Sequence, residues 1–254
     1  MINPAVVFFI AAAAHRRPAI QKRTGTPMLK KTFLSVVQDI SSGRFLPLLV
    51  AMLLYLGLGP TLGMLVRMKF LVDLLFAIIL FAGIYAVSRD KHQMRLALGL
   101  ALPAFVSTWL SLLFTSNWLW ITQAVFGILF FGYTISLMGR YIFSAQQVSR
   151  DVVYAAIITY LMIGLLWAYV YGVIAILAPG SFDVSRADIK SVDFIFTYYS
   201  FVTLTTLGFG DIVPLTGPAY SLVILEALVG QIYLTVLVAR LVGLHIAHSQ
   251  RNGP

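Results

Sequence analysis

Six long apolar blocks constrain this chain more than any other feature of its sequence. A helix needs about 20 mostly apolar residues to cross the hydrocarbon core of a bilayer. A seventh block, 192–207, is too short to cross, and it stands between the last two long ones. We therefore expect an all-α integral membrane protein with a short re-entrant segment between its fifth and sixth transmembrane helices. The six long blocks are 45–65, 70–87, 96–114, 118–138, 153–177 and 218–245.

The composition supports a lipid solvent for most of the chain. Hydrophobic residues make up 60% of the 254 residues and charged residues only 11%, whereas soluble proteins carry about 25% charged residues. The net charge of +9 does not indicate nucleic acid, because no basic stripe with interleaved aromatics is present. It is typical of cytoplasmic flanks that lie against anionic lipid. The chain has no cysteine, which excludes disulfides and thiolate metal sites.

The distribution of basic residues predicts the orientation. With the N-terminus inside, only four of the eighteen Lys and Arg residues fall outside, at Arg67, Lys69, Arg186 and Lys190, as the positive-inside rule requires. Both termini are then cytoplasmic, and the short seventh block enters from the outer side. A short chain with minimal tails is typical of a prokaryotic protein, which would place it in the plasma (inner) membrane.

These blocks predict four regions along the chain. We expect a basic cytoplasmic segment at 1–44, a four-helix membrane domain at 45–139, a second membrane domain with the short block at 150–247 and a short cytoplasmic tail at 248–254. The block 118–138 contains no Arg or Lys, whereas a voltage sensor needs several charges on its fourth helix. The first four helices therefore resemble a voltage-sensing domain only in number, and we expect weak voltage dependence.

The residues after the short block have the composition of a cation filter. A dehydrated cation needs oxygens that replace its water, and backbone carbonyls from several chains can supply them around one axis. Gly208 and Gly210 permit backbone angles that let successive carbonyls face the same way. Thr206 adds a hydroxyl oxygen, Phe209 is expected to pack outward into surrounding helices, and Asp211 to place carboxylates at the outer mouth.

This segment resembles the selectivity filter of the potassium channel superfamily. The matching run is Thr206-Leu207-Gly208-Phe209-Gly210-Asp211, and the eight residues before it, from Tyr198 to Thr205, resemble the pore helix of that family. The resemblance implies a homotetramer with K⁺ bound at Thr206, Leu207, Gly208 and Phe209, and no other cofactor. It also implies support of the filter by Tyr198, Tyr199, Thr203 and Thr205. The resemblance covers about 153–244, a third of the chain, and implies that the region 150–247 is a potassium channel pore domain.

Three positions depart from the commonest family pattern. Leu207 and Phe209 replace the usual valine and tyrosine, and Phe209 lacks the hydroxyl that ties the filter to the pore helix. Val202 stands where some members carry a glutamate that pairs with the filter aspartate. We therefore expect Asp211 to lack that partner and the filter to be held more loosely.

Three further residues of the apolar blocks are candidates for a functional role. Gly230 follows Asp211 by 19 residues (230 − 211), similar to the spacing of the family's gating hinge, although close helix packing would also favour glycine. Glu226 is a candidate to hydrogen-bond behind the filter or to sense pH; the alternative is a carboxyl, protonated or not, satisfied by a hydroxyl such as that of Thr203 or Thr205. Asp73 is expected to pair with Arg67 or Lys69 at the interface.

The sequence thus predicts a subunit of a potassium-selective channel. The sequence does not exclude the alternative of a weakly selective cation channel, because selectivity depends on how rigidly the carbonyls are held. A secondary transporter is less well supported, since those proteins often show broken helices in two corresponding halves and this chain shows one short block. An enzyme is not expected, because the intramembrane carboxyl groups of Asp73 and Glu226 have no nucleophile and base beside them.

Overall fold

The computed structural model describes residues 44–63, 69–88, 90–114, 116–185, 187 and 192–251. The chain falls into two units, 1–40 and 41–254, and the described residues all belong to the second. The expected basic segment at 1–44 therefore lies outside the described residues except for Arg44. Arg67, Arg186 and Lys190, which were assigned to the outer side, also lie outside them.

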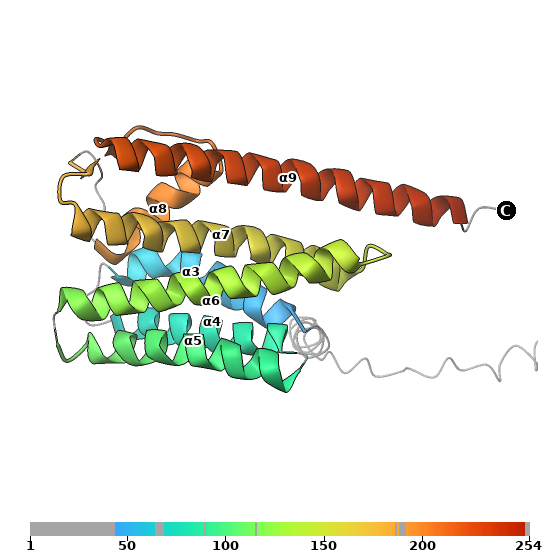
Figure 1. Ribbon diagram of the computed structural model, residues 1–254, viewed down its shortest axis with the longest axis horizontal. Coiled ribbons are helices and arrows are strands. Elements are labelled where there is room, and N and C mark those ends of the chain that lie inside the picture. Colours follow the sequence, from blue (N-terminus) through green and yellow to red (C-terminus); the bar gives the residue numbers. More distant parts are fainter. Residues whose placement is uncertain are drawn as a thin grey trace, which may run out of the picture. The chain divides into compact units, whose positions relative to one another are not determined.

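The second unit is built from long helices, as the apolar blocks predict. Four helices come first: α3 (Leu46–Gly63), α4 (Lys69–Val87), α5 (Lys91–Leu110) and α6 (Asn117–Ser144). The helices α7 (Arg150–Leu177) and α9 (Gly217–Arg251) then enclose a short helix, α8 (Val192–Leu204). Helices α3 to α7 lie side by side, and α8 is inclined between α7 and α9 (Figure 1).

Five of these helices are long and apolar enough to cross a membrane: α3, α4, α6, α7 and α9. The described part of the chain is thus helical in the way that a membrane protein requires. The third expected span, 96–114, corresponds to α5, which begins earlier and carries Lys91, His92 and Arg95 in its first turns. These polar residues lower its hydropathy, so the six-span topology stays a prediction.

Several helices extend beyond the apolar block that predicted them. Helix α6 continues to Ser144 and includes Arg140, and α7 begins at Arg150 rather than at 153. Ser149 caps α7 by accepting a hydrogen bond from the backbone N–H of Val152 at 3.3 Å, and Asp151 in the first turn suits the positive end of the helix dipole. The apolar blocks mark only the residues suited to hydrocarbon, whereas the helices also include polar ends.

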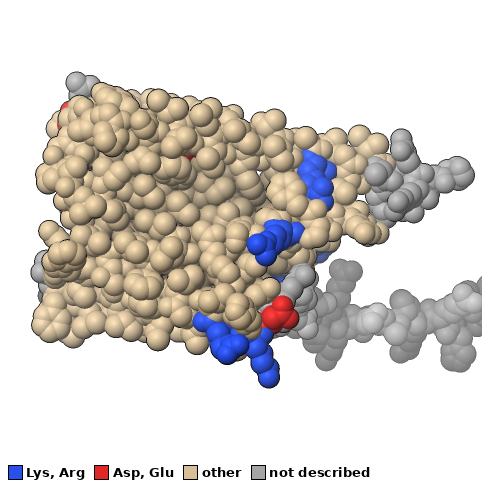
Figure 2. All heavy atoms as spheres, in the orientation of Figure 1, with Lys and Arg blue, Asp and Glu red and all other residues tan. Residues whose placement is uncertain are grey.

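The described cations gather at one end of the unit. Figure 2 shows Lys and Arg at the end where α5 and α7 begin and α6 ends, while the rest of the visible surface is almost free of charge. Arg44 lies beside the start of α3 and donates to the carbonyl of Ser88 at the end of α4 at 2.5 Å. Arg240 of α9 donates to the carbonyl of Ala145 just after α6 at 3.1 Å. These arginines bind carbonyls that helix ends leave without partners.

A two-stranded ribbon fixes the connections around α8. Strand β1 (Phe182–Asp183) pairs antiparallel with β2 (Val213–Pro214), and the Leu215 N–H donates to the Ser181 carbonyl at 2.8 Å. The segment that follows α7 is therefore tied to the segment that precedes α9. The loop between α8 and β2, residues 205–212, is held at both of its ends.

Candidate functional site

The C-terminal end of α8 positions residues 205–212, the filter loop, which contains the predicted selectivity filter from Thr206 to Asp211. The Val202 carbonyl accepts hydrogen bonds from the N–H groups of both Leu207, at 2.9 Å, and Gly208, at 3.4 Å. The Thr203 carbonyl accepts from the N–H of Thr206 at 3.0 Å, and the Thr205 hydroxyl donates to the Phe201 carbonyl. The first filter residues thus fold back onto the last turn of α8. The negative end of the helix dipole lies beside them, which favours a cation there.

The filter backbone alternates in hand along its length. Thr206, Gly208 and Gly210 have positive φ angles of 61°, 58° and 75°, whereas Leu207 and Phe209 do not. Glycine adopts such angles readily, but a β-branched residue rarely does. The strain at Thr206, on the order of 1–3 kcal/mol, is typical of a functional site. When the sign of φ alternates from residue to residue, each peptide plane is rotated back relative to the one before it. Successive carbonyls can therefore point toward the same side.

Two large side chains of the predicted filter are exposed beside the described part of the chain. Leu207 is 61% exposed and Phe209 is 66% exposed. Phe209 was expected to pack into surrounding helices, and the described helices of its own subunit do not cover it. Burial of both side chains therefore requires another molecule.

Tyr198 holds the filter aspartate. Its phenol in α8 donates a hydrogen bond to Oδ2 of Asp211 at 2.7 Å, and the N–H of Ile212 donates to Oδ1 at 3.1 Å. Val202 cannot supply a carboxyl partner, as expected, but Asp211 is bound to the pore helix by a different side chain. Tyr198, one turn earlier than Val202, supplies this partner, while the looser filter expected from Phe209 stays a prediction.

We expect Tyr198→Phe to weaken the outer end of the filter while leaving the fold intact. A hydrogen bond to a charged group contributes about 1.5–3 kcal/mol, and its loss removes the tie between Oδ2 of Asp211 and α8. Current through reconstituted protein should then decay faster during a sustained step of potential. Tyr85→Phe is a matched control, since Tyr85 is a largely exposed side chain of α4. An unchanged decay in Tyr198→Phe would contradict a supporting role for this hydrogen bond.

Tyr199 braces α8 from the other side. Its ring is 5% exposed and lies 5.1 Å from the ring of Tyr171 in α7 and 5.7 Å from the ring of Phe182 in β1, measured between centroids. With Ile212, these rings form an apolar cluster at the filter end. The pore helix is therefore fixed against both α7 and the ribbon.

Glu226 of α9 is buried behind α8. The phenol of Tyr171 donates to its Oε2, and Oγ of Ser200 contacts its Oε1. The expectation of a carboxyl satisfied by a hydroxyl is right in kind, but the partners are Tyr171 and Ser200 rather than Thr203 or Thr205. Ser200 lies on the face of α8 that turns toward α7 and α9, and helix rotation of this kind is not readable from sequence.

Gly230 packs directly against the end of α8. A Cβ at this position would lie 2.8 Å from the carbonyl oxygen of Leu204 and 2.8 Å from its Cδ1. The same carbonyl accepts a hydrogen bond from the phenol of Tyr160 at 3.2 Å. Close packing is therefore a sufficient reason for glycine here, and the hinge role stays a prediction.

Asp73 lies in α4, away from the filter. Its predicted partners, Arg67 and the side chain of Lys69, lie outside the described residues. Asp73 is 8% exposed and borders a cavity of about 430 Å³ whose other walls include Tyr55, Trp120 and Phe196. Phe196 belongs to α8, so this cavity connects the four-helix domain with the pore domain.

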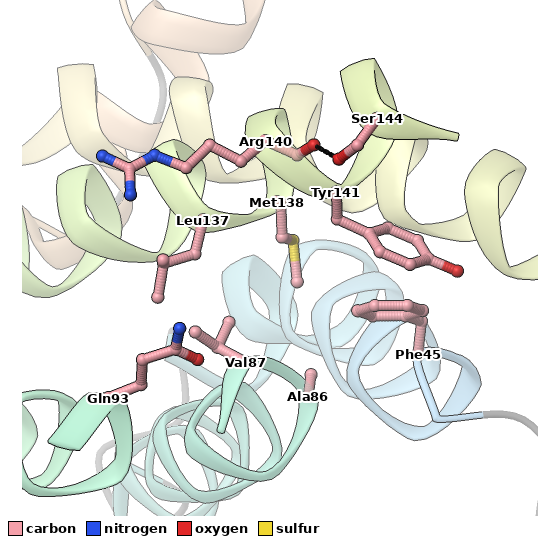
Figure 3. Close-up of a pocket in the computed structure, with 9 residues that line it drawn as sticks. All are labelled: Phe45, Ala86, Val87, Gln93, Leu137, Met138, Arg140, Tyr141 and Ser144. Carbon is pink, nitrogen blue, oxygen red and sulfur yellow. Dashed lines mark hydrogen bonds between the residues drawn. The ribbon is translucent and has the colours of Figure 1, made fainter. Parts of the chain in front are cut away.

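A smaller cavity lies at the opposite, basic end of the four-helix domain. It measures about 150 Å³, below the 300–1,000 Å³ typical of small-molecule sites. Figure 3 shows the facing rings of Phe45 and Tyr141 at one end of it and the Arg140 guanidinium at the other. The side chains of Leu137, Met138 and Val87 form its apolar walls. This cavity is separate from the filter and contributes nothing to it.

Comparison with known proteins supports a channel. Residues 163–245 match a family model described as "Ion channel", which represents two-helix channel domains and includes potassium channels. The match begins within α7 and ends within α9, so it contains α8, the filter loop, Glu226 and Gly230. No curated protein and no solved structure matches the chain. The matched region, with the five helices long and apolar enough to cross a membrane, supports an ion channel in a membrane protein.

Proposed function

We propose that four copies of this chain assemble into a passive, potassium-selective channel. The alternating hand of the backbone from Thr206 to Gly210 carries this proposal. One chain supplies one row of carbonyl oxygens, whereas a dehydrated K⁺ ion needs oxygens on all sides, so the row must be repeated around an axis. In this assembly K⁺ binds at Thr206, Leu207, Gly208 and Phe209, and Asp211 lies at the outer mouth.

The surface of α9 supports assembly. Its segment Gly217–Leu244 is strongly apolar, yet only 11% of that segment is buried within the chain. Leu207 and Phe209 are exposed as well. Exposed apolar surface of this extent requires lipid or neighbouring subunits. A tetramer would cover the filter side chains with the helices of adjacent chains, while the remaining faces contact lipid.

The basic end supports the proposed orientation. The described lysine and arginine side chains gather at the end of the bundle opposite the outer part of the filter loop (Figure 2). Cytoplasmic flanks of membrane proteins are enriched in such residues. We place this end, and both termini, in the cytoplasm at a plasma (inner) membrane, with anionic lipid as its partner.

The reversal potential of reconstituted protein tests the function. Purified protein in a planar bilayer, with K⁺ on one side and Na⁺ on the other, should give a current that reverses near the K⁺ equilibrium potential. A bilayer without protein is the control. Robust current that reverses near zero would contradict K⁺ selectivity and favour a weakly selective cation channel. Saturable flux coupled to a second ion would favour a secondary transporter.

A further inference from the structure

Glu226 joins three helices through one buried carboxyl group. It lies in α9, one turn before Gly230, and it is 0% exposed. Its Oε2 accepts a hydrogen bond from Tyr171 of α7, and its Oε1 contacts Oγ of Ser200 in α8. Ser200 is 0% exposed as well. These contacts hold the last helix against the helix that carries the filter.

The hydrogen-bond partners of Ser200 determine where the proton lies. Oγ of Ser200 is also 2.7 Å from the Gly164 carbonyl oxygen of α7. A serine hydroxyl has one proton, while a backbone carbonyl and an ionised carboxylate can only accept. An ionised Glu226 would therefore leave two acceptors competing for one proton. A protonated Glu226 donates to Ser200, and Ser200 then donates to the Gly164 carbonyl. Each of these three groups then has a hydrogen-bond partner.

Within the described ranges, no charged side chain that would favour ionisation faces Glu226. The titratable groups that face it are Tyr160 and Tyr171 from α7 and Tyr199 from α8, and phenols ordinarily stay neutral below about pH 10. Among the side chains that the structure describes, no lysine or arginine pairs with this carboxyl group. An unpaired carboxylate at this depth is strongly unfavourable.

We propose that Glu226 is a protonated carboxylic acid that latches α9 to the pore helix, and that its ionisation reduces conduction. This inference rests on the proposed channel function. Loss of the proton breaks one of the two contacts of Ser200, to α9 or to α7. Ser200 lies two residues before Val202, whose carbonyl holds Leu207 and Gly208. Release of Ser200 therefore loosens the turn of α8 that supports the filter.

The pH dependence of the current tests this latch. We expect the K⁺ current of the reconstituted wild type to fall several-fold from neutral to alkaline pH. Glu226→Gln should conduct without this pH response, because the amide can donate to Ser200 and accept from Tyr171 but cannot ionise. Asp73→Asn is the matched control, a second buried carboxyl group placed in the four-helix domain, and it should keep the wild-type response. A flat wild-type profile, or an unchanged response in Glu226→Gln, would overturn the proposal.

Infrared spectroscopy gives a readout that is independent of conduction. Purified wild type at neutral pH should show the carbonyl stretch of a protonated carboxyl group, and Glu226→Gln should lose that band. Identical spectra would show that Glu226 is ionised and would overturn the latch. A channel that proves unselective in the reversal-potential experiment, but keeps this band, would contradict the proposed function and leave the latch standing.

Discussion

Gly208→Ala is expected to abolish selective K⁺ current. Gly208 has a φ of 58°, and a Cβ there would meet no heavy atom within 4 Å. The effect is therefore conformational rather than steric within one chain. A left-handed conformation is less favourable for alanine than for glycine by about 1–2 kcal/mol, and four chains would incur this strain at the same ring of oxygens. Bilayer recordings of the variant, made under the conditions that give wild-type current, measure the loss.

Gly180→Ala separates filter geometry from general strain. Gly180 also has a positive φ, 84°, and open space around its Cβ position, but it lies between α7 and β1, outside the filter. It should therefore lower stability by a similar amount and leave the reversal potential unchanged. If Gly208→Ala conducts K⁺ as selectively as Gly180→Ala, the alternating backbone of the filter does not determine selectivity.

The sequence predicted the succession of long and short helices because lipid imposes simple requirements on helices. A span needs a long apolar run, and the block 192–207 is too short for one; most of it forms α8, a helix of 13 residues. The run from Thr206 to Asp211 indicated the filter because glycines alternate with bulky residues. The positive φ of Thr206 was not predictable, since threonine rarely adopts it and only the hydrogen bonds to Val202 and Thr203 show how it is held.

The partners of Glu226 and Asp211 were not predictable for a related reason. Glu226 contacts Tyr171, which lies 55 residues earlier, and Ser200, which lies 26 residues earlier. Which hydroxyl reaches it depends on the rotation of α7 and α8 about their own axes. Thr203 and Thr205 were as plausible as Ser200 from spacing alone. The hydrogen bond between Tyr198 and Asp211, which are 13 residues apart, was not predictable either. It depends on how the filter loop returns along α8.

The packing of Gly230 gives the second large expected effect. Gly230→Ala should lower the thermal unfolding midpoint of the purified protein, because the new methyl group would meet the Leu204 carbonyl oxygen at 2.8 Å. This oxygen belongs to the backbone and cannot rotate away as a side chain would. Overpacking of this kind typically destabilises by about 1–3 kcal/mol. The strain also moves α9 away from α8, so the current should fall together with the midpoint.

Gly243→Ala is the control on the same helix. Nothing lies within 4 Å of its Cβ position, and alanine is favoured over glycine within a helix by about 1 kcal/mol, so its midpoint should stay level or rise. If Gly230 is a gating hinge, Gly230→Ala should leave the thermal unfolding midpoint unchanged and alter the open probability. That result would assign Gly230 to gating. A lowered midpoint would instead assign it to the close contact between α9 and the end of α8.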